Sequence, residues 1–238
     1  MSNAFMVLAI AGLVSCSPQQ TKREIYSVLY DTTDPLLAMP EAQSLWGYMD
    51  GDDTSKDLVL RYSQLSDVEM NRVHQWERPA IQSGLFSNAV QEKKRQDESS
   101  KEFEELIETK DSIGASHSAI FKPILAELEY LASLPKGDHK QLIVYSNLRE
   151  NTDWLSFYRS QDLWLLENQT ESVIERFLDQ VPKNADYTDV ELTIVFIPID
   201  FKENREFKML REVYISVFKK LDVPITFSGN LVRPDSKP

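Results

Sequence analysis

The amino-acid sequence predicts an α/β fold with a doubly wound, mainly parallel central sheet, helices on both faces and one antiparallel edge strand. Three observations support this prediction. Short apolar segments rich in β-branched and aromatic residues recur, segments with helical periodicity separate them, and turn-forming residues stand between the two kinds. Strands that alternate with helices form parallel sheets, because each connection crosses over one face of the sheet. The chain has 238 residues, 42% of them hydrophobic, and can therefore bury a full core.

The first part of the predicted sheet lies before residue 80. Residues 24–31, Glu-Ile-Tyr-Ser-Val-Leu-Tyr-Asp, are expected to form a buried strand that ends in a turn. A short helix is predicted over 40–49, because Pro40 is tolerated in the first turn of a helix. Residues 57–64 predict a second strand, and 68–76 are expected to return antiparallel beside it.

Two helices of different character are predicted next. The segment 86–110 is highly charged, with Phe103, Leu106 and Ile107 at helical spacing, and it is expected to form a long helical insert mostly in water. A binding arm is the alternative for this segment. After Ser118, the apolar spacing predicts an amphipathic helix with Ile120, Ile124, Leu125, Leu128 and Leu131 on its buried side.

The remaining elements continue the alternation. Strands are predicted over 141–146, 192–199 and 224–228. Helical stretches are predicted over 154–158, 170–180 and 203–221.

The N-terminal segment predicts export. Residues 5–14 form an apolar run that is too short to cross a bilayer as a mature helix, but long enough for a signal peptide. It ends in Leu13-Val14-Ser15-Cys16, which resembles the bacterial lipobox, so Cys16 is expected to be acylated. The predicted organisation is a lipoprotein signal peptide (1–15), a tether (16–23), the main domain (24–230) and a tail (231–238). The alternative is a buried N-terminal helix with a chance cysteine.

The lipobox resemblance and the net charge together limit the location and the partners that the sequence predicts. The resemblance to lipoproteins implies a cell-envelope protein outside the cytoplasm, attached to the membrane through its lipid. Ser17 does not supply the aspartate that retains many lipoproteins in an inner membrane, which favours an outer membrane in a Gram-negative cell. The net charge of -12 repels phosphate backbones, so no nucleic-acid partner is expected.

Polar side chains follow several predicted strands, where a doubly wound sheet binds its ligands. Asp31, Thr33 and Asp34 follow the first strand, and Ser118 precedes the amphipathic helix. Ser146 and Asn147 end the 141–146 strand, and Asp200 follows the 192–199 strand. Carboxylate, hydroxyl and amide oxygens of this kind suit Mg²⁺ or another divalent cation.

The same residues resemble the metal-ion-dependent adhesion site of von Willebrand factor A-like domains. That site has D-x-S-x-S after the first strand, a Thr in a later loop and an Asp after the central strand. Asp31 and Thr33 fit the first two places, Pro35 stands in the third, Ser118 fits the Thr, and Asn147 replaces the Asp. In this family the metal binds a carboxylate of a partner protein, so the resemblance implies a non-catalytic protein-binding module.

The departures from the family pattern predict a weak or absent metal site. Asn147 removes one negative charge and Pro35 removes one hydroxyl. Asp34, Ser146 and Asp200 are possible accessory ligands. Four aromatic residues downstream are expected either to extend the contact face or to lie in the core: Trp154, Phe157, Tyr158 and Trp164.

Two other functions stay open. Tyr30-Asp31 and Tyr145-Ser146 also resemble motifs of haloacid dehalogenase-like phosphoryl-transfer hydrolases. That chemistry needs a second aspartate two residues after the first, where this chain has Thr33, and Asp34 lies one position too far. The other alternative is a structural envelope component that binds no ligand. The sequence shows no phosphate-binding glycine loop or nucleophile elbow, and its three histidines are not spaced as metal ligands.

Overall fold

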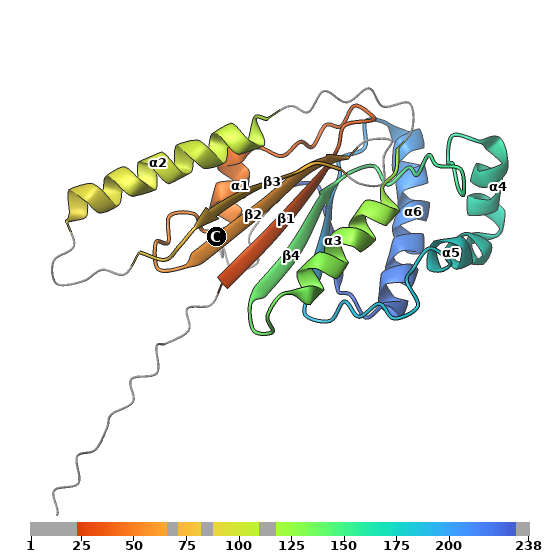
Figure 1. Cartoon of the computed structure of the whole chain (residues 1–238). Helices are drawn as coiled ribbons and strands as arrows, with labels where there is room; N and C mark the ends of the chain where they lie inside the picture. Colours follow the sequence, from red (N-terminus) through yellow and green to blue (C-terminus); the bar gives the residue numbers. More distant parts are fainter. Residues whose placement is uncertain (1–22, 66–70, 82–87, 110–117, 232–238) are drawn as a thin grey trace, which may run out of the picture.

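The computed structural model describes residues 23–65, 71–81, 88–109 and 118–231. These residues contain one six-stranded sheet with the order β3-β2-β1-β4-β5-β6 (Figure 1). Its strands are β1 (Arg23–Asp31), β2 (Asp57–Leu65), β3 (Val73–Arg78), β4 (His139–Tyr145), β5 (Glu191–Val195) and β6 (Ile225–Ser228). The helices are α1 (Ala42–Tyr48), α2 (Ala89–Ile107), α3 (Phe121–Ser133), α4 (Ser160–Asn168), α5 (Thr170–Leu178) and α6 (Phe201–Lys220).

The sheet is parallel except for β3, which pairs antiparallel with β2 at one edge. Helices pack on both of its faces, so the predicted doubly wound α/β fold is confirmed. From the central strand β1, the chain first adds β2 and β3 on one side and then β4, β5 and β6 on the other. The strand order therefore reverses between β1 and β4, and ligand sites of such folds lie at the carboxyl edge of this junction.

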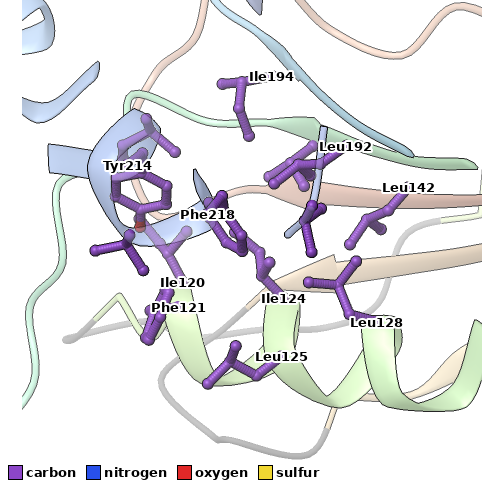
Figure 2. Packing of buried hydrophobic residues seen from close by; sticks show 14 of the residues in the cluster. Ile120, Phe121, Ile124, Leu125, Leu128, Leu142, Leu192, Ile194, Tyr214 and Phe218 are labelled. Atoms are coloured by element: carbon purple, nitrogen blue, oxygen red, sulfur yellow. The ribbon is translucent and has the colours of Figure 1, made fainter. Parts of the chain in front are cut away.

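The larger core lies between the sheet and the helices α3, α5 and α6. Alternate residues of β1, Ile25 and Leu29, point into it, because successive side chains of a strand face opposite sides. Figure 2 shows how Ile124 and Leu128 of α3 meet Leu142 of β4 in this layer. Burial on this face fixes α3 against the sheet, and with it the buried residues 118–120 directly before the helix.

The other face is covered by α1 and α2. Phe103 of α2 packs edge-to-face on Trp46 and Trp76, with ring centroids 5.2 and 5.1 Å apart, and Ile107 is also buried. The charged segment thus forms a helix, as predicted, but a helix with a buried apolar side that covers the sheet. The sequence interpretation as an insert mostly in water described only its outer face.

One predicted helix is absent from the structure, and one predicted strand is shorter than expected. Residues 154–158 form no helix; Thr152 N–H donates to Leu155 O (2.9 Å) and Asn151 bridges to Ser156, so this stretch is a folded loop before α4. The strand predicted over 192–199 ends at Val195. Its neighbour β6 has only four residues, and Pro198 has no N–H with which to continue a ladder.

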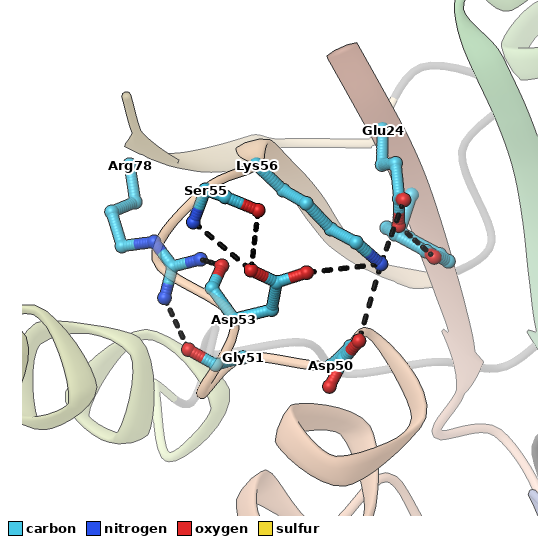
Figure 3. Close-up of polar contacts among 8 residues, drawn as sticks. Glu24, Asp50, Gly51, Asp53, Ser55, Lys56 and Arg78 are labelled. Atoms are coloured by element: carbon cyan, nitrogen blue, oxygen red, sulfur yellow. Dashed lines mark hydrogen bonds and ion pairs between the residues drawn. The ribbon is translucent and has the colours of Figure 1, made fainter. Parts of the chain in front are cut away.

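A salt-bridged turn closes the amino edge of the sheet, opposite the switch point (Figure 3). Lys56 Nζ lies 3.0 Å from Glu24 at the start of β1 and 3.2 Å from Asp50. Arg78 donates to the backbone carbonyls of Gly51 and Asp53. These contacts join the α1–β2 turn to β1 and β3.

The predicted signal peptide, tether and tail fall within 1–22 and 232–238, apart from their junction residues, and thus outside the described residues. Across the described ranges, none of the helices combines the length and the hydropathy needed to cross a bilayer.

Candidate functional site

Asp31 forms the centre of the candidate site at the carboxyl edge. It ends β1 and is fully buried. Its Oδ1 accepts hydrogen bonds from the Thr33 backbone N–H (3.0 Å) and the Thr33 hydroxyl (2.5 Å). Its Oδ2 accepts one from the Ser146 hydroxyl (2.8 Å), at the end of β4. The structure therefore joins Asp31, Thr33 and Ser146 across the switch point.

The turn formed by Asp31 and Thr33 is not special by itself. The same pair of hydrogen bonds links Ser55 to Asp53 and Thr188 to Asp186. There the hydrogen bonds lower the aspartate pKa, as expected for a stabilised carboxylate. Burial raises the pKa of Asp31 despite the hydrogen bonds from Thr33 and Ser146. Its distinguishing features are therefore burial and the contact with a second strand.

Asp34 and Asn147 make a second link between the same loops. Asn147 Nδ2 donates to Asp34 Oδ2 (2.8 Å), and the Tyr158 hydroxyl donates to the same oxygen. The Arg149 guanidinium lies over the Tyr158 ring, 4.1 Å from its centroid, and 3.5 Å from Glu206 of α6. One polar network thus crosses the edge from the loop after β1 to the start of α6.

The backbone after β4 is strained. Leu148 has a φ of 64°, in the left-handed region that non-glycine residues seldom occupy, and its side chain is fully buried. Its N–H donates to Ser146 Oγ (2.9 Å), and the next N–H, of Arg149, donates to Asn147 Oδ1 (2.9 Å). Strain of this kind costs about 1–3 kcal/mol and concentrates at functional sites.

Ser118 is held beside this loop by the backbone. Its N–H donates to Asn151 O (3.2 Å), and the Asn151 N–H donates back to Ser118 O (2.8 Å). Three residues later α3 begins, and the N–H groups of its N-cap Ile120 and of Phe121 donate to Glu150 Oε2 (3.1 and 3.0 Å). Glu150 therefore binds the positive end of α3 to the β4–α4 loop.

Three buried polar atoms near the start of α3 have no hydrogen-bond partner among the described residues: Ser118 Oγ, Glu150 Oε1 and the Tyr214 hydroxyl. Burial raises the pKa of Glu150 to about 7, against the opposite effect of the two helix N–H groups. Burial also raises the pKa of Tyr214, and the charges of Glu150 and Asp31 act in the same direction. Unpaired buried polar atoms are rare in folded proteins, so these three atoms make the start of α3 a candidate part of the site.

The remaining predicted residues are Asp200, four aromatic residues and Cys16. Asp200 serves as the N-cap of α6, accepting from the Glu203 N–H (2.8 Å), rather than joining the hydrogen bonds around Asp31. Of the four aromatic residues, Phe157 is buried and Trp154 packs against the core, whereas Tyr158 is 43% and Trp164 52% exposed. Cys16 lies outside the described residues.

Sequence reasoning missed Glu150 and Leu148 as members of the site. Glu150 belongs to the mainly polar run Asn-Leu-Arg-Glu-Asn. No feature of this run indicates that the Glu150 carboxylate is buried rather than exposed to solvent. A left-handed backbone at Leu148 has no signal in residue type. Tyr158 was noted as an aromatic residue, but its hydrogen bond to Asp34 depends on the tertiary fold.

Comparisons with known proteins leave the family open. The chain matches no family model and no curated protein. It is similar in structure to the conserved hypothetical protein BatB from Bacteroides thetaiotaomicron, with a TM-score of 0.39, 10% identity, and 90% of this chain and 92% of that chain covered.

Two further solved structures are similar to the chain, with TM-scores slightly lower than that of BatB. One is the pilus adhesin SpaC from Lactobacillus rhamnosus GG, in its open conformation (TM-score 0.37, 8% identity, covering 86% of this chain and 30% of that chain). The other is the human COPII-coat protein Sec24c (TM-score 0.33, 8% identity, covering 90% and 30%). The chain thus spans less than a third of these two proteins.

Proposed function

We propose that the chain is a lipid-anchored, von Willebrand factor A-like binding module that recognises a protein partner at the carboxyl edge of its sheet. The observation that carries the proposal is the network around Asp31, in which buried and strained loop ends from β1 and β4 hold one another in place. Strained backbone lowers the stability of a protein and is found mainly at functional sites, where it holds polar groups in a fixed arrangement. The network lies at the switch point, where folds of this class bind their ligands.

The residues at this edge fit a weak divalent-cation site. The Thr33 hydroxyl gives its proton to Asp31 and so keeps its oxygen lone pairs for another partner, and Ser118 Oγ is buried and unpaired. Thr33, Ser118 and Asp34 would hold the ion, with Asp31 and Asn147 orienting them. A bound Mg²⁺ would supply a positive charge that accepts a partner carboxylate. Affinity should be low, because no group of three or more acidic, histidine or cysteine side chains in the described ranges is placed to hold a metal.

The state of Asp31 supports binding rather than catalysis. A phosphoryl-transfer nucleophile must reach its substrate, whereas Asp31 is fully buried and both of its oxygens already accept hydrogen bonds. We therefore propose a non-catalytic module. The alternative is a phosphoryl-transfer hydrolase that resembles the haloacid dehalogenase-like class.

Titration with Mg²⁺ and Mn²⁺ tests the metal part of the proposal. At a concentration tenfold above Kd, a cation that binds only the folded chain stabilises it by about 1.4 kcal/mol, which raises Tm by about 3–5 °C. We expect this rise in the wild type, its loss in Asp31→Asn, and its retention in Asp186→Asn, whose aspartate makes the same local turn. If neither ion raises Tm, the edge is a metal-free binding surface.

An aryl phosphate assay in the presence of Mg²⁺ tests the non-catalytic part. We expect no turnover above that of Asp31→Asn. Turnover by the wild type that disappears in this variant would identify an enzyme.

A further inference from the structure

The loop between β5 and α6 and the first residue of α6 expose three large apolar side chains. Ile197 is 39% exposed, Ile199 57% and Phe201 93%. Burial of such side chains stabilises a folded protein, and the chain does not gain this stabilisation here from its own core. Exposed apolar side chains that lie near one another are typical of interaction sites, and Ile197, Ile199 and Phe201 occupy alternate positions of one short segment.

The backbone of this loop is fixed, so the exposure is built into the fold. Asp200 Oδ1 accepts from the Glu203 N–H (2.8 Å), and Glu203 Oε2 accepts from the Ile199 N–H (2.5 Å). These two bonds form a reciprocal cap at the start of α6. Phe196, just before the loop, is buried against Phe207 with ring centroids 4.4 Å apart. A surface ordered before binding loses little conformational entropy when a partner docks.

The loop belongs to the same edge as the Asp31 network. It follows the carboxyl end of β5, which lies beside β4 in the sheet. Arg149 reaches from the loop after β4 to Glu206, in the second turn of α6, while its guanidinium stacks on Tyr158. Tyr158 in turn donates to Asp34. Polar contacts therefore connect the candidate site to the helix that carries Phe201.

The charges on this edge favour a basic partner. The nearby cations already face carboxylates: Arg149 and Lys202 lie 3.5 and 3.9 Å from Glu206, and Arg205 lies 3.3 Å from Glu167. Within the described part of the chain, no cation lies within ion-pair distance of Asp34 or Asp200. The whole chain carries a net charge of -12, so a second copy would bring like charges together.

We propose that Ile199 and Phe201 dock an apolar segment of a partner protein that carries lysine or arginine beside its apolar residues. The apolar side chains bury Phe201, and the basic ones face Asp200 and Asp34. This inference rests on the proposed function, because it names the partner chemistry for the same edge.

Selection from a random peptide library displayed on phage tests the proposal, with the full-length chain in lipid nanodiscs as bait. We expect enriched peptides in which aromatic or aliphatic residues stand next to lysine or arginine. The double variant Ile199→Ser/Phe201→Ser should bind a synthetic copy of them at least about tenfold more weakly. Val90→Ser, which removes an apolar residue 77% exposed on α2, should leave the affinity unchanged.

Several results would overturn the proposal. One is a selection without an apolar and basic peptide family, and another is equal binding by wild type and the double variant. Peptides that lose affinity in Asp31→Asn but keep it in the double variant would reject the apolar loop and leave the binding-module proposal standing. A dimer seen by light scattering, and lost in the double variant, would assign the loop to self-association and overturn the basic partner.

Discussion

The buried carboxylate of Asp31, near the switch point, lies in a different environment from that of an exposed aspartate that makes the same turn. Asp31 and Asp186 make the same turn with a threonine two residues later, but only Asp31 is enclosed by the fold and reaches another strand. Desolvation opposes ionisation of Asp31, and the three hydrogen bonds it accepts favour it. A hydrogen-bonded aspartate in a loop is thus an ordinary turn, and its position between two strands is what makes it a candidate for function.

Glu150 gives the first prediction at this scale. Burial raises its folded-state pKa to about 7, above the ordinary value of 4.5. As pH rises from 4.5 to 7, the unfolded chain releases the proton while the folded chain retains it, so the free energy of unfolding falls. Wild type should lose up to about 3 kcal/mol over this window relative to Glu150→Gln, which does not titrate. Urea denaturation of both proteins at several pH values measures the difference.

The control for this experiment is Glu175→Gln, on the exposed side of α5. Its stability should follow the wild type at every pH. A constant difference between wild type and Glu150→Gln from pH 4.5 to 7 would show that Glu150 titrates normally.

At the scale of single elements, periodicity located what the fold buries. The apolar run of β1 and the 3.6-residue spacing in α3 both persist in the structure, because β1 is buried on both faces of the sheet and α3 has a continuous apolar side that faces the sheet. The failure at 154–158 has a tertiary cause. Its aromatic residues are spaced as in a helix, yet the Ser156 N–H donates to Asp162 Oδ2 (3.0 Å) and ties the stretch back on itself before α4.

Removal of one side chain tests the role of α2. Phe103 is 1% exposed and packs against Trp46 and Trp76, so Phe103→Ala should lower the free energy of unfolding by about 3–5 kcal/mol. Val90 lies on the same helix but is 77% exposed, and Val90→Ala should change stability by less than about 0.5 kcal/mol. Chemical denaturation of the two variants measures both values. Equal, small effects would make α2 an independent appendage.

On the scale of the whole molecule, the sequence predicted the sheet edge at which the candidate site lies, but not all of the residues that form it. Asp31, Ser146 and Asn147 were predicted from the ends of apolar runs, and a parallel sheet brings such ends together. Glu150 and Tyr214 come from a loop and a helix that both pack in the larger core and meet only when it forms, so no local pattern indicates them. The orphaned atoms around α3 are likewise a property of packing and cannot be deduced from residue order.

The position of β1 determines how a lipid anchor would orient the molecule. Cys16 precedes Arg23, the first residue of β1, by a segment that spans at most about 25 Å when extended. The nine residues of β1 then separate its two ends by about 26 Å. If Cys16 carries the lipid, the segment before Arg23 keeps the amino edge of the sheet near the bilayer, and we expect Asp31 and Phe201 to lie farther from it on average.

Energy transfer to a dye in the lipid measures this orientation. A donor placed by His139→Cys, beside Glu24 at the amino edge, should transfer more strongly than one placed by Phe201→Cys, because the length of the sheet separates them. Cys16 is the one cysteine of the chain, so if it is acylated as predicted, each variant carries a single free thiol. Cys16→Ser should abolish transfer from both positions and release the protein from vesicles. Equal transfer from the two donors in the acylated protein would place the proposed binding edge at the membrane surface and contradict the outward-facing arrangement.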